Sequence, residues 1–390
     1  MKIKTSILGS TGSIGSTTLK IIDKQPHSFS INLLSAKNNS KLIIKQIKKY
    51  KPKIFVISDE KVYLKIKKKF KNSITKIFQK FEKIKLNNSD LTISSIPGIE
   101  GLEPTLTMIK KSKKILIANK ESIICGWSLI KNSAQKNKTK IIPIDSEHFS
   151  ILKLLENHKI SEIKKIFLTA SGGPFLNYKP NQLKSISYKD AIKHPKWKMG
   201  KKISIDSSTL MNKMLEIIEA QKLFNIPSSK LDVIIHPNSL VHAIIELKNG
   251  LIKFIYHETT MIIPIANAIF EKNLDIENFF RKKKKNYKPA VESLQFLRVN
   301  KKIFPIYKLK DRVNEYHSTP IIINAANELL IDLFHKKKIS YLAISGTIMK
   351  IMNDRNYKKY AIRKARNFHE IKNIDEWTKN TIMRKLNLYV

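Results

Sequence analysis

The sequence predicts an α/β protein with a doubly wound parallel sheet in its N-terminal part, then a central α/β part and a helical C-terminal part. Three observations carry this prediction. Short apolar runs alternate with segments of helical length along the N-terminal part of the chain. A turn containing Gly9, Gly12 and Gly15 separates the first apolar run from the first helical pattern. From residue 303 onward the apolar spacing is helical.

The N-terminal elements follow one another in a regular order. Residues 2–8 carry enough apolar side chains for a strand, and after the glycine turn a helical pattern runs through Leu19 and Ile22. Parallel strands joined by helices are the arrangement that this alternation predicts. Further apolar runs lie at residues 31–34, 54–57, 91–93, 115–118 and 140–144.

The remainder of the chain divides into three parts. Residues 149–270 combine strand patterns at 165–169 and 233–235 with a helix at 209–224, which predicts a second α/β or α+β domain. Residues 271–302, with Arg281 and the four lysines after it, show no clear period and are interpreted as a linker. Helices are expected at 320–336, 341–352 and 370–388. The expected domain boundaries are therefore 1–148, 149–270, 271–302 and 303–390.

Length and composition favour a folded enzyme of two or three domains. The chain has 390 residues, of which 42% are hydrophobic, and no apolar run approaches the about 18 residues of a membrane span. The first ten residues have neither a sustained apolar stretch nor a small-residue cleavage site, so no signal peptide is expected. Cys125 is the single cysteine, which is typical of a reducing compartment. We expect a cytoplasmic protein without a membrane partner.

The net charge of +43 raises the alternative of a nucleic-acid-binding protein, because lysine and arginine bind phosphates. The lysines are spread along the whole chain, and no arginine occurs before Arg281. Arginine is the residue that usually reads phosphates and bases, because its planar fork matches them. Lysine, isoleucine and asparagine are abundant together, which a coding bias toward adenine and thymine explains better, so no specific nucleic-acid partner is expected.

The glycine turn is a candidate nucleotide site. Glycines at a first strand-to-helix turn let backbone N–H groups approach a pyrophosphate, which the helix N-terminus also favours. The spacing here, G-x-x-G-x-x-G, varies from the usual fingerprint, and an ordinary turn is the alternative. Lys37 follows the second strand, where an acidic residue would favour NAD. A lysine there suits the 2′-phosphate of NADP, unless it is one more lysine of a lysine-rich chain.

Two segments carry candidate metal ligands. Asp145 and Glu147 follow the run at 140–144, at the end of a strand where open α/β sheets bind ligands, and their oxygens suit Mg²⁺ or Mn²⁺. Further on, Ser208 is expected to cap a helix on which Asn212 and Glu216 share one face and Lys213 flanks it. Glu216 would complete the metal site. A solvated turn and an exposed helix face are the alternatives.

Two loops are candidates for holding the substrate. Ser171 and two glycines follow the strand at 165–169 and offer a hydroxyl and backbone amides to an anion, although a plain turn has the same sequence. The segment from His194 through Trp197 to Gly200 resembles a lid that excludes water. A histidine in a loop can equally be structural or solvated.

Taken together, these motifs resemble the 1-deoxy-D-xylulose 5-phosphate reductoisomerase family over essentially the full length of the chain. The motifs occur in the family's order. They are the glycine turn, Ala118-Asn-Lys-Glu-Ser122, Asp145-Ser-Glu-His148, Ser171-Gly-Gly-Pro-Phe175, His194-Pro-x-Trp-x-Met-Gly200, the block from Asp206 to Glu216, and Asn324-Ala-Ala-Asn-Glu328. The family often has glycine where Ala36 stands, a difference that could crowd the cofactor slightly.

The resemblance implies a Rossmann-like NADPH-binding domain at 1–148, a catalytic and connective domain at 149–270, a linker, and a C-terminal helical domain. It also implies a homodimer and a small phosphorylated sugar as substrate. Cofactor-binding residues would be Thr11, Gly12, Ser13, Ile14, Ala36, Lys37, Asn38, Asn119, Glu121 and Gly200. The metal ligands would be Asp145, Glu147 and Glu216, which with His194 form the catalytic group. Substrate contacts would come from Lys120, Ser146, Glu147, Ser171, His194, Ser207, Asn212, Lys213 and Glu216.

The implied reaction is the NADPH-dependent rearrangement and reduction of 1-deoxy-D-xylulose 5-phosphate to 2-C-methyl-D-erythritol 4-phosphate in isoprenoid biosynthesis, by retro-aldol cleavage and aldol rejoining before hydride transfer. One alternative is a metal-free dehydrogenase of the semialdehyde type, which needs a nucleophilic cysteine. Cys125 has apolar neighbours in sequence and is expected to pack in the core. The other alternative is the basic nucleic-acid-binding protein, for which aromatic and arginine clusters are missing from the sequence.

Overall fold

The computed structural model describes residues 2–85, 88–197, 200–271, 274–280 and 294–388. Its residues cluster in two compact units. The first falls within Met1–Ser122, Trp127–Asp145 and Met261–Pro289, and the second within Ile123–Gly126, Ser146–Thr260 and Ala290–Val390. Among the described residues, no helix combines the length and the apolar character that crossing a bilayer requires.

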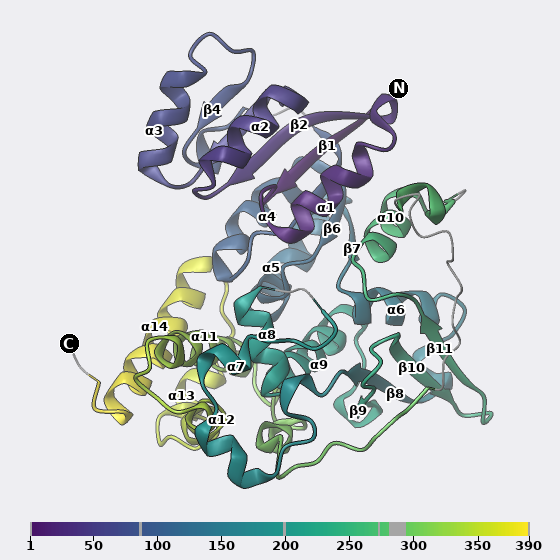
Figure 1. The fold of residues 1–390 in the computed structure, drawn as a ribbon, viewed down its shortest axis with the longest axis vertical. Coiled ribbons are helices and arrows are strands. Elements are labelled where there is room, and N and C mark those ends of the chain that lie inside the picture. The colour runs from purple at the N-terminus through teal and green to yellow at the C-terminus, as the bar shows by residue number, and fades with distance from the viewer. Residues whose placement is uncertain (1, 86–87, 198–199, 272–273, 281–293, 389–390) are drawn as a thin grey trace. The chain divides into compact units, whose positions relative to one another are not determined.

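The first unit is built on a parallel sheet in the order β4-β3-β2-β1-β5-β6-β7 (Figure 1). Its central strands are runs of branched apolar residues because both faces of the sheet are covered, and Ile7, Leu33 and Phe55 are completely buried. The strands are β1 (Ile3–Leu8), β2 (Phe29–Ala36), β3 (Ile54–Ile57), β4 (Lys76–Phe78), β5 (Ser89–Ser94), β6 (Ser112–Ile117) and β7 (Lys140–Pro143).

The sheet grows from β1 in two directions, toward β4 on one side and, through β5, toward β7 on the other. Since parallel crossovers are right-handed, the connecting helices of the two halves cover opposite faces, which makes the sheet doubly wound. Helix α10 packs against α1. The helices are α1 (Ser13–Ile22), α2 (Ser40–Tyr50), α3 (Glu60–Lys69), α4 (Leu102–Ile109), α5 (Lys120–Asn137, of which 123–126 cluster with the second unit) and α10 (Ile262–Phe270).

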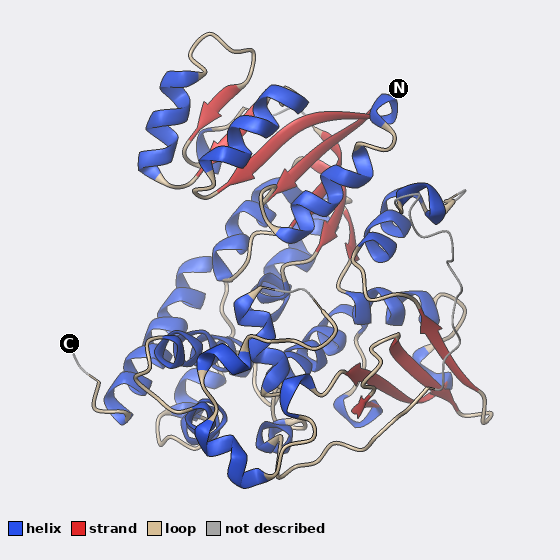
Figure 2. Ribbon diagram, in the orientation of Figure 1, coloured by secondary structure: helices blue, strands red, loops and turns tan. Residues whose placement is uncertain are grey.

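The second unit contains a mixed four-stranded sheet in the order β11-β10-β8-β9, drawn as the shorter group of red arrows in Figure 2. Strand β8 pairs in parallel with β9 and antiparallel with β10, and β11, paired with β10, is the last strand on that side among the described residues. Helices α6 and α9 both contact this sheet. The strands are β8 (Ile163–Ala170), β9 (Leu231–Ile235), β10 (Val241–Leu247) and β11 (Ile252–Tyr256).

Helices make up the rest of the second unit. Helix α11 contacts both α12 and α14, and residues Ile322, Ala326 and Leu330 of α11 are fully buried. The helical C-terminal part predicted from the sequence is confirmed, as is the α/β class. The helices are α6 (Ser146–Leu155), α7 (Tyr188–Ala191), α8 (Lys201–Ser208), α9 (Met211–Phe224), α11 (Thr319–His335), α12 (Tyr341–Ile351), α13 (Tyr357–Ala361) and α14 (Phe368–Lys385).

The expected cap at Ser208 is wrong. Ser208 ends α8 and its hydroxyl donates to the carbonyl of Ile205, while α9 begins only after Leu210, whose φ is 66°. A leucine rarely adopts a left-handed backbone, so its sequence gives no sign of this break. One helix was expected at 209–224. The structure has α9 from Met211 to Phe224, and a separate helix, α8, ends just before it at Ser208.

The expected linker at 271–302 lies partly outside the described residues, including Arg281 and the lysines after it. Within the described part, residues Ile276–Phe279 form a short 3-10 helix, and Leu297 pairs with Ile235 at the end of β9. The four-part division of the chain into domains remains a prediction.

Candidate active site

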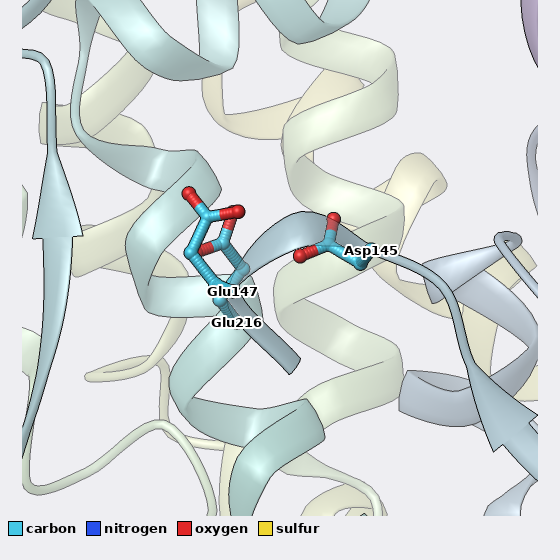
Figure 3. A group of neighbouring side chains, drawn as sticks. All are labelled: Asp145, Glu147 and Glu216. Atoms are coloured by element: carbon cyan, nitrogen blue, oxygen red, sulfur yellow. The ribbon is translucent and has the colours of Figure 1, made fainter. Parts of the chain in front are cut away.

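Three carboxylates meet where β7 leads into α6 (Figure 3). Asp145 follows β7, Glu147 lies in the first turn of α6, and Glu216 projects from the middle of α9. Each contributes one oxygen to a group in which all the oxygens lie within 4.8 Å of one another. The structure thus brings together the three predicted metal ligands, two from neighbouring positions and one from a distant helix.

Two lysines balance these negative charges. Lys213, 5% exposed, donates from Nζ to Glu147 Oε1 and, at 2.5 Å, to Glu216 Oε2. Burial alone would lower the pKa of Lys213, but the two carboxylates outweigh burial and raise it, so the ammonium stays charged. Nζ of Lys120 lies 3.5 Å from Asp145 Oδ2. Charge-balanced carboxylate oxygens at this spacing are the hard donor set that fits Mg²⁺ or Mn²⁺.

Glu216 is held both at its side chain and at its backbone. Asn212, one turn earlier on α9, donates from its amide to Glu216 Oε1, as expected from the i,i+4 spacing. His148 of α6 donates from Nε2 to the backbone carbonyl of Glu216 at 2.9 Å. His148 was not among the predicted site residues, although its position beside Glu147 was the available signal. Ser146 donates to Glu147 Oε2 at 2.5 Å, so the neighbouring carboxylate is held as well.

Ser171 and His194 also meet in the structure. The backbone N–H of Trp197 donates to His194 Nδ1 at 2.9 Å, so the ring proton lies on Nε2 and is donated to Ser171 Oγ, also at 2.9 Å. Ser171 Oγ accepts a second hydrogen bond from the N–H of Gly173 at 3.1 Å. Because both acceptor positions of Oγ are used, the remaining capacity of the hydroxyl is to donate its proton, which an anion can accept.

The structure makes His194 a neutral histidine. Burial, followed by the positive charge of Lys213, lowers its pKa to about 4. We therefore expect a pH-dependent contribution to stability. The unfolded chain, with a histidine pKa of about 6.5, binds the proton more readily, so this contribution is complete above that pH and is lost as the pH falls toward 4.

In thermal unfolding between pH 7 and pH 4, the wild type should lose about 1–2 kcal/mol more than His194→Gln, after discounting for solvent screening of a half-buried ring. His369→Gln, at an exposed position, is the matched control and should follow the wild type. Identical pH profiles for the wild type and His194→Gln would contradict the assignment.

Ser207 lies beside the loop that carries Ser171. Gly173 has φ of 62°, and a Cβ at this position would come within 3.0 Å of Ser208 Cα and 3.1 Å of the Ser207 carbonyl oxygen. Only a glycine allows the loop to approach α8 so closely. The predicted substrate-binding serines at 171 and 207 are therefore carried by segments in direct contact.

Two histidine rings that extend from Trp197 of the expected lid were not predicted from the sequence. The Trp197 ring meets His242 edge to face with centroids 6.0 Å apart, and His242 stacks on His257 at 3.9 Å. Both histidines are buried, at 2% and 6% exposure. Both histidines are far from Trp197 in the sequence, so no local pattern indicated that the three rings would be in contact. Lys198 and Met199 of the expected lid lie outside the described residues.

The predicted cofactor residues of the first unit gather at one edge of its sheet. Thr11 and Gly12 lie in the turn after β1, and Ser13 and Ile14 begin α1. Ala36 ends the neighbouring strand β2, and Lys37 and Asn38 follow it. The turn is tied to β2 because the backbone N–H of Ser10 donates to the Ser35 carbonyl at 2.7 Å. A Cβ on Gly15 would lie 2.4 Å from the Gly9 carbonyl oxygen, so the tight turn requires glycine there.

Asn119 and Glu121 stand at the start of α5, at the same end of the sheet, because parallel strands all end there. The amide of Asn119 donates to the carbonyl of Ile96 at 2.6 Å and to Glu121 Oε2 at 3.1 Å. Gly200 lies in the second unit, where it precedes α8, and its expected contact with the cofactor remains a prediction. Cys125 is buried, in agreement with its expected packing.

Comparisons with known proteins agree with the resemblance seen in the sequence. A family model described as 1-deoxy-D-xylulose 5-phosphate reductoisomerase matches residues 5–126, and models of the C-terminal domains of the same enzyme match residues 141–224 and 258–381. A reductoisomerase of this name from Pelagibacter ubique is 44% identical over 388 residues, covering 96% of this chain and 97% of that protein. One from Clostridium tetani is 36% identical, covering 98% and 99%.

Solved structures agree as well. The reductoisomerase of Zymomonas mobilis in complex with NADPH superimposes with a TM-score of 0.86 at 27% identity, covering 100% of both chains. A DOX-P reductoisomerase in complex with NADPH, fosmidomycin and magnesium has a TM-score of 0.87 at 30% identity, covering 100% of this chain and 99% of that one. The Rossmann-like NADPH-binding fold expected for the N-terminal part is thereby confirmed, and the dehydrogenase and nucleic-acid alternatives are not favoured. The chain belongs to the 1-deoxy-D-xylulose 5-phosphate reductoisomerase family.

Proposed function

We propose that this enzyme converts 1-deoxy-D-xylulose 5-phosphate and NADPH to 2-C-methyl-D-erythritol 4-phosphate in isoprenoid biosynthesis, with a divalent cation. The observation that carries the proposal is the convergence of Asp145, Glu147 and Glu216, with Lys213 bonded to the two glutamates, in a chain of this family. Solved relatives were crystallised with NADPH, with magnesium and with fosmidomycin. In this chain, particular residues are proposed to bind NADPH, the divalent cation and the phosphorylated substrate.

The edge of the seven-stranded sheet is the proposed NADPH site. The backbone amides of the glycine turn and the start of α1 would bind the pyrophosphate, and Lys37, which is exposed, would bind the 2′-phosphate. When bound, NADPH supplies the hydride. The full set is Thr11, Gly12, Ser13, Ile14, Ala36, Lys37, Asn38, Asn119, Glu121 and Gly200.

The three carboxylates are the proposed metal ligands. A bound Mg²⁺ or Mn²⁺ supplies Lewis-acid polarisation of neighbouring substrate oxygens. The protein keeps these ligands ready: Asn212 and His148 fix Glu216, and Ser146 fixes Glu147. Held in this way, the carboxylates lose little conformational entropy when a cation binds.

The substrate phosphate is proposed to bind next to this cluster. The hydroxyl of Ser171, the hydroxyl of Ser207 on the touching segment, and the ammonium of Lys213 are donors suited to a phosphate. His194 contributes as a neutral donor to Ser171 rather than as a charge. Asn212, Lys120, Ser146, Glu147 and Glu216 complete the proposed substrate contacts, and the segment from His194 to Gly200 would exclude water.

Oxidation of NADPH, followed by absorbance with the phosphorylated sugar present, tests the function. Turnover should require the substrate, should stop when the protein is stripped of divalent cations with a chelator, and should return on addition of Mg²⁺ or Mn²⁺. The product should carry a branched carbon skeleton by nuclear magnetic resonance. A folded protein that binds NADPH but oxidises it at the same rate without the substrate would refute the proposed reaction.

Lys37→Glu is expected to raise the KM for NADPH about 10-fold or more, equivalent to about 1.4 kcal/mol, because a carboxylate repels the 2′-phosphate. The KM for NADH, which lacks that phosphate, should change little. Lys45→Glu, an exposed lysine on α2, is the matched control and should leave both constants unchanged. Equal increases for the two cofactors would remove Lys37 from the 2′-phosphate site.

A homodimer formed through the outer edge of the four-stranded sheet is also proposed. Among the described residues β11 is the last strand of the sheet order, and Leu251, Ile252 and Phe254 are 57%, 62% and 45% exposed. Apolar side chains on an open edge favour pairing with another strand, and a second copy offers an identical one. Sedimentation should show a dimer for the wild type and a monomer for the Ile252→Lys, Phe254→Lys double variant.

Two further assignments remain predictions from the sequence. The four parts at 1–148, 149–270, 271–302 and 303–390 are proposed as the NADPH-binding domain, the catalytic and connective domain, the linker and the helical domain. A cytoplasmic location is proposed from the use of a single cysteine.

A further inference from the structure

The short segment that carries Ser207 is held by two helices from the C-terminal part of the chain. Asn327 of α11 donates from Nδ2 to Asp206 Oδ1 at 2.6 Å. Tyr341, the first residue of α12, donates from Oη to the backbone carbonyl of Ser208, also at 2.6 Å. The two hydrogen bonds therefore reach the residues on either side of Ser207.

Both contacts are shielded from water. Asp206 and Tyr341 are 1% and 4% exposed, and Asn327 and Ser208 are completely buried. Asp206 also pairs through Oδ2 with Lys202 at 3.1 Å, so each of its oxygens has a partner. Hydrogen bonds in such surroundings are costly to leave unmade, because no water can replace the lost partner.

The backbone near Ser207 needs this support. Leu210, two residues after Ser208, has φ of 66°, which is unfavourable for a leucine. A left-handed non-glycine residue persists only where the surrounding structure determines its conformation. Tyr341 supplies part of that surrounding, since its hydroxyl fixes the end of α8 just before the break.

Tyr341 also contacts the loop that carries Ser171. Its ring meets Phe175 edge to face, with centroids 5.3 Å apart, and Phe175 follows directly on Gly173-Pro174. One side chain thus touches both segments that bear the candidate phosphate-binding serines. Its hydroxyl fixes the Ser207 segment, and its ring fixes the Ser171 segment.

We infer that Asn327 and Tyr341 are positioning residues that hold the Ser207 hydroxyl beside the Ser171 hydroxyl, so that both donate to one phosphate. The inference rests on the proposed function, in which these two serines bind the substrate phosphate. It gives a role to the Asn324-Ala-Ala-Asn-Glu328 motif, which the metal and cofactor sites leave unused. The helical C-terminal part then determines affinity for the phosphate without touching it.

Tyr341→Phe is the sharpest test, because it removes the hydroxyl and keeps the ring against Phe175. The matched control is Tyr357→Phe, in which an equally buried tyrosine of the same helical part loses its hydrogen bonds to Thr319 at 2.6 Å and Glu315 at 2.7 Å. Both variants lose a tyrosine hydroxyl bond, so both should unfold at a lower temperature. Only Tyr341→Phe should weaken phosphate binding.

In the full-length enzyme, weaker phosphate binding should raise KM and leave kcat nearly unchanged. For Tyr341→Phe we expect the KM for 1-deoxy-D-xylulose 5-phosphate and the inhibition constant of inorganic phosphate to rise together by about 10-fold, with kcat within about twofold of the wild type. Asn327→Ala should shift both constants in the same direction. If Asn327→Ala does not fold, Tyr341→Phe alone decides the question.

Ser207→Ala separates failure of the inference from failure of the proposed site. An unchanged KM in Ser207→Ala would overturn the phosphate site and the inference with it. A raised KM in Ser207→Ala with an unchanged KM in Tyr341→Phe would overturn the positioning role alone. Equal rises in Tyr341→Phe and Tyr357→Phe would also overturn it, because a general loss of stability would then be the cause.

Discussion

Glu216→Gln is expected to reduce metal-dependent kcat/KM by about 10³-fold or more, the scale seen when a group that stabilises transition-state charge is removed. Glutamine keeps the shape of the side chain but has one oxygen and no charge. The remaining carboxylates, Asp145 and Glu147, would bind a divalent cation more weakly. Titration with Mn²⁺, followed by electron paramagnetic resonance, should show affinity about 10- to 100-fold lower than in the wild type.

Glu246→Gln serves as the control for this loss. Glu246 lies on β10 of the same unit and pairs with Lys164 on the surface, away from the carboxylate cluster. Its replacement should leave both Mn²⁺ affinity and turnover at wild-type values. A Glu216→Gln enzyme with normal Mn²⁺ affinity would show that Glu216 is not a ligand, whatever its activity.

The central strands of the first sheet could be predicted because both of their faces are buried. Strand β3 occupies residues 54–57 as expected. A short run of apolar, mostly β-branched residues between polar segments is typical of a strand buried on both faces. The edge strands β4 and β11 were missed. Lys76 and Lys253 interrupt them, and β11 exposes most of its side chains, so the period that marks a half-buried strand is absent.

The candidate site was predictable where its parts are close in sequence. Asp145 and Glu147 are neighbours, and Asn212 with Glu216 follows the helical period. The contacts between residues far apart in the sequence could not be predicted. Asn327 and Asp206 are 121 positions apart, and His148 reaches the backbone of Glu216 across 68. Such pairings depend on how helices pack, and a single sequence without relatives carries no record of which side chains meet.

Lys213→Met is expected to make the stability of the protein depend more strongly on bound metal. In the wild type the Lys213 ammonium neutralises Glu147 and Glu216, of which Glu216 is completely buried. Removing one partner of a buried ion pair costs about 3–5 kcal/mol, because the carboxylates stay buried without compensation. With divalent cations removed, the free energy of unfolding should fall by that amount.

Magnesium should then restore most of the loss, since a cation bound by the same carboxylates replaces the missing charge and no longer competes with the lysine for their oxygens. The stabilisation by Mg²⁺ should therefore be larger in Lys213→Met than in the wild type, even though the variant binds the substrate phosphate poorly. Lys222→Met, a change on the same helix at a lysine whose pKa burial lowers, should show no such dependence on metal. Thermal unfolding of the three proteins with chelator and with Mg²⁺ measures the difference, and equal stabilisation of all three by Mg²⁺ would show that Lys213 and the metal do not share these ligands.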